Sequence, residues 1–326
     1  MNMLKGRTVV ITGASSGIGR ATALAFARYR CRLILSARRL GVLEQVAEQC
    51  RHARAEAITV QTDVTDSEAV HELARATEEA FGGIDVWVNN AGTGVFGGYS
   101  NVPFALHRRT VEVNLFGAMH GAYAVLPVFK RQRHGTLINN ISIGAWCPSP
   151  YTASYTASKF GLRGFSASLR QELLAWPDIH VCSVFPTIVD TPGLEHAANF
   201  SGRRINPGPL LYAPEDVADA IVELAIHPRD EVAVGWPARV AQVAYNTARR
   251  PTEWAVGSAM RTIVKHADSA PPYEGALLHP VPQGTSTSGG WRRCNHVPSA
   301  RTLTRLGLTG VGIAILLAGM AHSKSH

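Results

Sequence analysis

Short apolar runs alternate with longer segments of helical pattern along most of the chain. Seven runs are rich in β-branched and other apolar residues and have the length of strands: 8–11, 33–36, 58–61, 86–88, 137–141, 181–185 and 232–234. The segments between them are long enough for helices. Because right-handed crossovers return each helix to the sheet, this alternation predicts an α/β fold, with a doubly wound parallel sheet of about seven strands and helices on both faces.

In a doubly wound sheet of the Rossmann type, ligands bind beyond the carboxyl ends of the strands. The residues that follow Ile11, Val88, Ile141 and Phe185 are therefore the first candidates for a functional site. The segment 191–212 contains six proline and glycine residues, which interrupt any long helix or strand. Its length and irregularity suit a lid over such a site.

The last part of the chain differs in composition from the rest. The strand and helix pattern predicts one domain over residues 1–265, and residues 266–300 are rich in Pro, Gly, Ser and Thr, as linkers are. The tail 301–326 contains an uncharged apolar run, 306–321, with basic residues before it. Sixteen helical residues span roughly 24 Å, against about 30 Å for a bilayer core. The run predicts a membrane segment, a helix packed on protein or a disordered tail.

Composition and charge narrow the class of protein. Apolar residues make up 46% and charged residues 17% of the 326 positions, which is typical of a folded globular chain. The five cysteines form no C-x-x-C pair, which argues against a disulfide framework or a metal site. Because no apolar signal region follows Met1, we expect a cytoplasmic location. The alternative is a cytoplasmic protein that associates with a membrane through the tail.

The positive charge does not indicate nucleic-acid binding. The formal charge is +8, and the residues after Pro251 contribute seven Lys or Arg against three Asp or Glu, so half of the excess lies in the last quarter of the chain. A nucleic-acid site would require a basic stripe interleaved with aromatic residues, and no element has one. We therefore expect a small-molecule partner and no nucleic acid.

A glycine-rich turn follows the first predicted strand and leads directly into a helical run. Glycines let the backbone turn tightly and approach a pyrophosphate, and the N–H groups of the new helix can bind it. The turn predicts a dinucleotide-binding loop, with an ordinary strand-to-helix turn as the alternative. The loop residues expected at the cofactor are Gly13, Ser15, Ser16, Gly17, Ile18 and Gly19.

The second predicted strand ends in two arginines instead of an acid. An NAD-preferring site usually has an acid here, which binds the ribose 2′-hydroxyl. This chain has Ala37 followed by Arg38 and Arg39, whose guanidinium groups suit a 2′-phosphate. The sequence therefore favours NADP(H), with NAD(H) as the second choice, and a solvated surface pair is the alternative interpretation.

Tyr155 and Lys159 stand four residues apart, which places them on one face of a helix. An ammonium group and an oxidised nicotinamide nearby both favour the phenolate, so Tyr155 becomes a usable proton donor or acceptor near neutral pH. Ser142, at the end of the fifth predicted strand, can hydrogen-bond a substrate oxygen as charge develops on it. Ser142 and Tyr155 are thus the predicted substrate contacts.

Together these motifs resemble the short-chain dehydrogenase/reductase family over roughly residues 5 to 235. The loop has the spacing T-G-x-x-x-G-x-G, which is similar to the family's nucleotide loop, and Ser142, Tyr155 and Lys159 match its catalytic spacing. The resemblance implies hydride transfer between NADP(H) and an alcohol or carbonyl, with Asn114 as a fourth catalytic residue. It also implies that the cofactor is contacted by Asp63, Val64, Asn90, Ala91, Gly92, Tyr155, Lys159, Pro186, Val189 and Thr191.

Thr187 and Tyr151 depart from the catalytic and cofactor-binding motifs and are interpreted separately. Thr187 stands where the family has a glycine, and because a β-branched residue tolerates positive φ poorly, we expect a small local adjustment there. Tyr151 precedes Tyr155 by four residues but has no lysine four positions after it. We therefore assign Tyr151 to the wall of the substrate pocket.

A second class of function remains open, a non-catalytic NADP(H)-binding sensor or scaffold on the same fold. The intact set of Ser142, Tyr155 and Lys159 favours an enzyme, because a sensor needs no proton-transfer residues. The apolar lid and tail suggest a hydrophobic carbonyl, such as a lipid, steroid or retinoid-like compound. Family members commonly pair their fourth and fifth helices, so a homodimer or homotetramer is expected.

Overall fold

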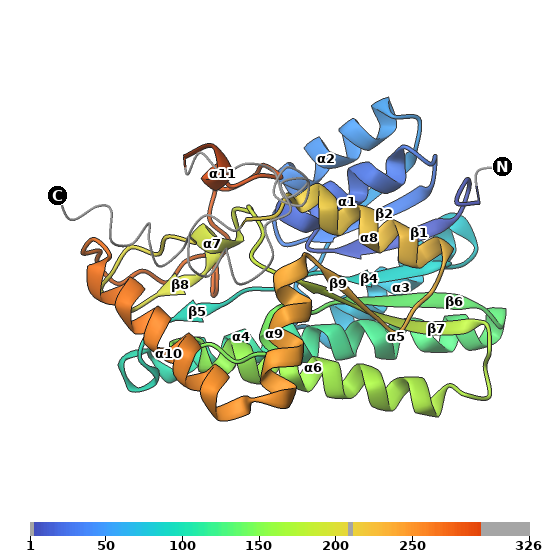
Figure 1. Ribbon diagram of the computed structural model, residues 1–326. Coiled ribbons are helices and arrows are strands. Elements are labelled where there is room, and N and C mark those ends of the chain that lie inside the picture. Colours follow the sequence, from blue (N-terminus) through green and yellow to red (C-terminus); the bar gives the residue numbers. More distant parts are fainter. Residues whose placement is uncertain (1–2, 208–210, 295–326) are drawn as a thin grey trace.

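The computed structural model describes residues 3–207 and 211–294 and contains one parallel sheet between two layers of helices (Figure 1). The sheet has seven strands in the order β3-β2-β1-β4-β6-β7-β9, and β5 and β8 form a separate pair. The strands are β1 (Thr8–Thr12), β2 (Arg32–Ala37), β3 (Glu56–Gln61), β4 (Val86–Asn89), β5 (Val95–Phe96), β6 (Gly135–Asn140), β7 (Ile179–Pro186), β8 (Ala198–Asn199) and β9 (Glu231–Val234).

The helices divide between the two faces of the sheet and one end of the molecule (Figure 1). Helices α1 (Gly17–Ala27), α2 (Leu40–His52) and α8 (Pro214–Ile226) cover one face, and α3 (Ser67–Phe81), α5 (Gly117–Gln132) and α6 (Ala153–Glu172) cover the other. The remaining helical elements are η1 (Tyr99–Asn101), α4 (Phe104–Val111), η2 (Glu112–Phe116), η3 (Ile143–Ala145), α7 (Gly193–His196), α9 (Trp236–Thr247), α10 (Arg249–His266) and α11 (Trp291–Cys294).

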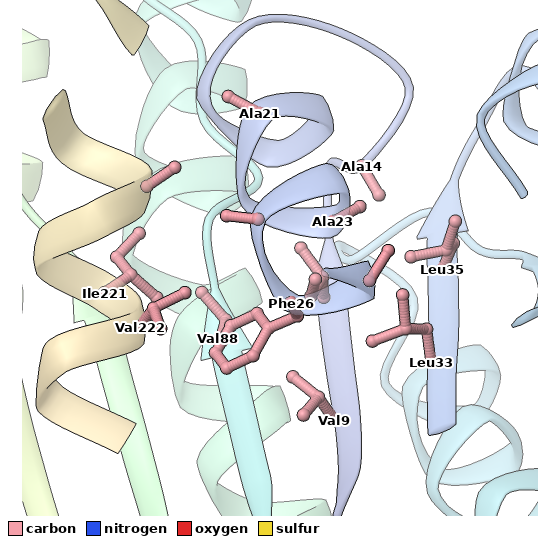
Figure 2. Packing of buried hydrophobic residues seen from close by; sticks show 14 of the residues in the cluster. Val9, Ala14, Ala21, Ala23, Phe26, Leu33, Leu35, Val88, Ile221 and Val222 are labelled. Carbon is pink, nitrogen blue, oxygen red and sulfur yellow. The ribbon is translucent and has the colours of Figure 1, made fainter. Parts of the chain in front are cut away.

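Alternate residues of the central strands face opposite helical layers, because side chains point to the two faces of a strand in turn. Val9 of β1 lies in one core with Phe26 of α1, and Figure 2 shows Phe26 close to Val9 and Val88. The next residue, Val10, lies in the other core with Trp87. Since all five side chains are fully buried, the sheet is covered on both faces, as a parallel sheet requires.

The predicted doubly wound fold is confirmed. Each of the seven predicted runs overlaps a strand of the sheet, with ends that differ by at most two residues from the prediction, and neighbouring strands pair in parallel. The pairing of β5 with β8 was not predicted. Each of these strands has only two residues, which is too short for a periodic pattern to reveal.

The described part of the predicted linker folds back on the domain that contains the sheet. The Arg204 N–H donates to the Asp268 carbonyl, and Asn199 and Tyr273 exchange main-chain hydrogen bonds. Leu277 is fully buried with Val95 of β5. Proline and glycine composition alone does not distinguish such a segment from a solvated linker, because both use extended backbone.

Two predicted features fall wholly or partly outside the described residues. The apolar run 306–321 lies beyond residue 294, and residues 208–210 of the predicted lid are also outside. Within the described ranges, no helix is long and apolar enough to cross a bilayer.

Candidate active site

The candidate site lies at one edge of the sheet, where the carboxyl ends of β1, β4, β6 and β7 meet. The glycine loop follows β1, Asn90 follows β4, Ser142 follows β6 and Thr187 follows β7. The structure places the other predicted cofactor residues after the strands of this same edge: Ser15, Ser16, Ile18, Asp63, Val64, Ala91, Gly92, Val189 and Thr191, with Pro186 as the last residue of β7. The sheet thus brings together residues up to 180 positions apart in the chain.

The loop between β1 and α1 requires glycine for two different physical reasons. Gly13 and Gly17 have φ angles of +67° and +55°, which glycine adopts without strain. Gly19 has no space for a side chain, because a Cβ there would lie 2.2 Å from the Gly13 carbonyl oxygen and 2.5 Å from Asn90 Nδ2. This close packing brings the first turn of α1 against the loop and directs its N–H groups toward the sheet edge.

Asn90 connects the loop to the neighbouring strands. Its Nδ2 donates to the carbonyl oxygen of Thr12 at 3.0 Å, and its Oδ1 accepts from Asn140 Nδ2 at 2.9 Å. The Thr12 hydroxyl oxygen accepts from the N–H groups of Asn90 and Ala91. Asn90 therefore acts as structural support for the loop in this arrangement.

Ser142 and Tyr155 lie beside each other. Ser142 lies two residues after β6 and caps η3, with its hydroxyl oxygen accepting from Gly144 N–H at 3.0 Å. The Tyr155 side chain projects from the first turn of α6, and a Cβ on Gly144 would lie 3.3 Å from its ring and 3.5 Å from the Ser142 hydroxyl oxygen. Burial raises the pKa of Tyr155, and the neighbouring Ser142 hydroxyl only partly opposes this effect. With the residues of this chain alone, Tyr155 is therefore a neutral phenol at pH 7, which is able to donate a proton.

Lys159 lies one turn after Tyr155 on α6 and is 5% exposed. Its Nζ donates to the Asn140 carbonyl oxygen at 3.0 Å and lies 5.7 Å from the centroid of the Tyr155 ring. Burial lowers the pKa of Lys159 to about 8. An ammonium group with a pKa near neutral can both hold positive charge beside the phenol and exchange its proton.

Asn114 is buried in the π-helical turn η2, between α4 and α5. Its Oδ1 accepts from Thr93 N–H at 2.8 Å, and its Nδ2 donates to the Thr93 carbonyl and to the Ser158 hydroxyl. The side chain thus joins the segment after β4 to α6. Both Nδ2 hydrogens are used in these bonds, so the side chain holds Ser158, the residue before Lys159.

The two arginines after β2 are bonded to a distant segment of the chain. Arg38 donates to main-chain carbonyl oxygens of residues 276–278. Arg39 donates to those of residues 281, 283 and 284, and lies 3.4 Å from the Ser15 hydroxyl oxygen of the glycine loop. Both guanidinium groups therefore lie at the same edge of the sheet as the glycine loop, and Arg39 contacts that loop.

Asp63 is already paired within the protein. Its carboxylate accepts from the N–H and hydroxyl of Thr65 and forms an ion pair with Arg109. Burial raises the pKa of Asp63, but these hydrogen bonds and the charge of Arg109 together lower it below the usual value. The cap of α3 is supplied by Asp66, whose carboxylate accepts from the N–H groups of Glu68 and Ala69.

The segment after β7 adapts to Thr187 without strain. Among the described residues, positive φ at non-glycine positions occurs only at Arg30, Arg54, Arg133 and Tyr151, so Thr187 does not need the conformation that glycine favours. Its N–H donates to the Val234 carbonyl oxygen at 3.2 Å. Thr191 lies against the glycine loop, since a Cβ on Gly17 would be 3.2 Å from the Thr191 Cβ.

Sequence reasoning missed Asp190, which is 3% exposed. Its carboxylate accepts from the Ser288 hydroxyl at 2.8 Å and from the Trp291 N–H at 3.0 Å. The one sequence feature that points to Asp190 is its position, an acidic residue next to apolar ones four residues after a buried strand. A charge buried at such a place needs hydrogen-bond partners. Those partners lie about 100 residues later in the chain, so no local pattern identifies them.

Replacing Lys159 with methionine is expected to change the pH dependence of stability. The ammonium group loses its proton near pH 8 in the folded chain and near pH 10.5 in the unfolded chain, so the unfolded chain binds more protons between these values. The wild type therefore gains stability as the pH rises through this window, while Lys159→Met does not. The difference in free energy of unfolding between the two proteins should change by about 2 kcal/mol between pH 7 and pH 10.

Urea denaturation at both pH values measures this change. Lys130→Met provides the control, because Lys130 is an exposed lysine of α5 and its replacement should leave the pH dependence unaltered. An equal pH dependence in wild type and Lys159→Met would show that the lysine is solvated in the folded protein.

Comparison with known proteins agrees with this architecture. The sequence model described as short chain dehydrogenase matches residues 7–200. The uncharacterized oxidoreductase YxnA of Bacillus subtilis is 30% identical over 303 residues, which is 90% of this chain and 84% of that protein.

Solved structures with bound dinucleotides share the fold. An alcohol dehydrogenase from the archaeon Thermococcus sibiricus, complexed with 5-hydroxy-NADP, has a TM-score of 0.61 at 30% identity and covers 70% of this chain and 96% of its own. A short chain dehydrogenase/reductase from Burkholderia phymatum, in complex with NAD, has a TM-score of 0.68 at 26% identity and covers 77% and 97%. The extent of the family match and of the similarity to YxnA shows that this chain belongs to the short-chain dehydrogenase/reductase family of oxidoreductases.

Proposed function

We propose that this chain is an NADP(H)-preferring oxidoreductase that interconverts an alcohol and a carbonyl compound, with Tyr155 as the general acid and base. The observation that carries the proposal is the pair of neighbouring side chains Ser142 and Tyr155 with buried Lys159 beside them, all at the edge of the sheet where the glycine loop lies. A sensor or scaffold would have no use for a buried lysine next to a partly exposed phenol, because burying an ammonium group is unfavourable.

The shape of the loop supports a dinucleotide as the cofactor. A Cβ at Gly19 would overlap the Gly13 carbonyl, so the backbone there is packed as closely as a pyrophosphate-binding turn needs. Arg38 and Arg39 supply donors for a 2′-phosphate, and Tyr155 and Lys159 lie at the opposite end of the site for the nicotinamide ribose. When bound, the nicotinamide supplies or accepts the hydride. The other residues proposed to hold the cofactor are those of the glycine loop, Asp63, Val64, Asn90–Gly92, Pro186, Val189 and Thr191.

Side chains of this protein would carry out the proton transfer. For reduction of a carbonyl, the Tyr155 hydroxyl donates its proton to the substrate oxygen, and the Ser142 hydroxyl hydrogen-bonds the same oxygen. The Lys159 ammonium stabilises the phenolate that remains. Asn114 acts as a positioning residue, because it fixes Ser158 one residue before the lysine.

The surroundings of Tyr155 favour a hydrophobic carbonyl substrate. Cβ atoms built on Gly94 and Gly144 would lie 3.6 and 3.3 Å from the Tyr155 ring, so both glycines leave room beside the phenol. Tyr151 lies nearby with its ring centroid 5.6 Å from that of Phe96, which supports the proposal that it lines the pocket.

A homodimer or homotetramer through α5 and α6 also belongs to the proposal. Tyr123 of α5 is 72% exposed and Phe160 of α6 is 37% exposed, which suits helices that pack against a second copy.

Cofactor titration tests the preference for NADP(H). Wild type should bind NADPH at least about tenfold more tightly than NADH, because charge-assisted hydrogen bonds to a phosphate contribute about 1.5–3 kcal/mol each. The double variant Arg38→Gln, Arg39→Gln should bring the ratio of the two dissociation constants close to one. Isothermal titration calorimetry with each cofactor measures the ratio.

Arg28→Gln is the matched control, since Arg28 is an exposed arginine at the opposite end of α1 from the loop. Equal affinity of wild type for NADPH and NADH would refute the preference. Failure of both wild type and the double variant to bind either cofactor would refute the cofactor assignment itself.

A further inference from the structure

Residues 276–292, here called the strap, run across the cofactor edge of the catalytic domain. One end is held by Leu277, which is fully buried with Val95 and Val102. The other end is held by Asp190, whose carboxylate accepts from the Ser288 hydroxyl and the Trp291 N–H, while its carbonyl accepts from Gly289. Between these ends the strap buries little, since residues 278–288 are partly or fully exposed.

The strap occupies the donors that a dinucleotide would need. Carbonyl oxygens of residues 276–278 accept from Arg38, and those of 281, 283 and 284 accept from Arg39. The Ser286 carbonyl accepts from the Gly17 N–H at 3.0 Å, at the first residue of α1. The Thr285 carbonyl accepts from Arg20 in the same turn. The strap therefore bonds both the arginines at the proposed 2′-phosphate position and the helix start at the proposed pyrophosphate position.

We propose that the strap is an intramolecular competitor of the cofactor, which must lift from the glycine loop and from Arg38 and Arg39 before NADP(H) can bind. The inference rests on the proposed function, because it takes the nicotinamide dinucleotide as the ligand. The strap supplies uncharged carbonyl oxygens to donors that suit anions, so a closed strap and a bound dinucleotide exclude each other.

The strength of the competing bonds makes the exchange feasible. A phosphate dianion adds the attraction of opposite charges and can accept two parallel hydrogen bonds from one guanidinium group, whereas a neutral carbonyl supplies no opposite charge. The middle of the strap has few buried side chains to hold it, and segments with few buried contacts open at low free-energy cost. NADP(H) can therefore displace the strap, while the empty site stays covered.

Gly284→Ala tests the proposal by loosening the middle of the strap. Gly284 has a φ of +67°, and a Cβ there would lie 2.3 Å from His196 Nε2 and 2.9 Å from the Pro192 Cβ. The substitution therefore disfavours the closed strap without changing any residue proposed to bind the cofactor. Leu277→Ala is an independent second variant, because it removes the buried side chain that holds the other end.

Gly82→Ala is the matched control. Gly82 has a similar φ of +80° at the end of α3, with no atom within 4 Å of the position of a Cβ. It shares the backbone strain of Gly284→Ala but lies outside the strap.

The expected result is a gain in affinity. In the full-length chain, both strap variants should bind NADPH and NADH with apparent dissociation constants at least about tenfold lower than wild type, because the binding-competent fraction rises. Gly82→Ala should remain within about twofold of wild type. In stopped-flow experiments, the observed rate of NADPH binding should level off with concentration in wild type, where strap opening limits it, and should continue to rise in Gly284→Ala.

Three other outcomes would overturn the inference. Unchanged affinity in both strap variants would show that the strap does not compete. Weaker binding in both would show that the strap covers the bound cofactor and contributes to its site. If wild type and both variants bind neither NADPH nor NADH, the proposed function fails together with the inference, whereas in the first two outcomes the proposed function stands.

Discussion

Tyr155→Phe should lower kcat on any carbonyl substrate by about 10²- to 10⁴-fold, the range that a positioned general acid contributes. The substitution removes the hydroxyl of a ring that lies beside Ser142, and it leaves the ring in place beside Lys159. Because the ring and the lysine remain, the dissociation constant for NADPH should stay within about threefold of wild type.

A panel of aldehydes and ketones, followed by NADPH absorbance, measures this effect. Tyr151→Phe is the control, since Tyr151 lies two residues before α6, next to Phe96, and its substitution removes the same kind of hydroxyl group from the predicted pocket wall. Its kcat should stay within about tenfold of wild type. Undiminished turnover in Tyr155→Phe would exclude it as the acid, and tight NADPH binding by wild type without turnover on any carbonyl would favour the sensor.

Gly19→Ala should destabilise the fold by about 2 kcal/mol or more and greatly weaken NADPH binding. A Cβ at Gly19 would lie 2.2 Å from the Gly13 carbonyl oxygen and 2.8 Å from its carbonyl carbon, so the backbone of the loop must move. The shifted atoms are those that form the pyrophosphate-binding turn. Stability and cofactor binding should therefore be lost together.

Thermal and urea unfolding, combined with NADPH titration, measure both effects. Gly164→Ala is the matched control in the interior of α6, where no atom lies within 4 Å of the position of a Cβ. That variant should be more stable than wild type by about 0.5–1 kcal/mol, because alanine is the better helix former. A stability of Gly19→Ala equal to that of wild type would mean that the loop has room which the structure does not show.

The elements of the sheet could be predicted because their signals are local. Each of the seven strands of the sheet contains a short run rich in β-branched or apolar residues that a helical segment follows or precedes. In the central strands β1, β4 and β6, burial on both faces makes every position buried. The spacing of Tyr155 and Lys159 is also local, since four residues on a helix place both side chains on one face. The glycine pattern of residues 13–19 likewise predicted a turn that the steric contacts of Gly19 require.

Other features depend on partners that are distant in the chain. Asp63 is bonded to Arg109, and the pair β5 and β8 joins residues about 100 positions apart. Residues 266–292 have the composition of a linker, but Leu277 and the partners of Asp190 hold their last part against the domain. None of these contacts has a periodic or compositional signature, because each depends on two segments that only the folded sheet brings together.

The amino-acid pattern was thus sufficient for the doubly wound sheet, the glycine loop and the spacing of Ser142, Tyr155 and Lys159, since hydrophobic periodicity and short-range geometry specify them. Only the tertiary structure determined which acceptors the guanidinium groups of Arg38 and Arg39 bond. Main-chain carbonyl groups are present at every residue, so which of them a guanidinium meets depends on the path of the backbone and not on side-chain identity.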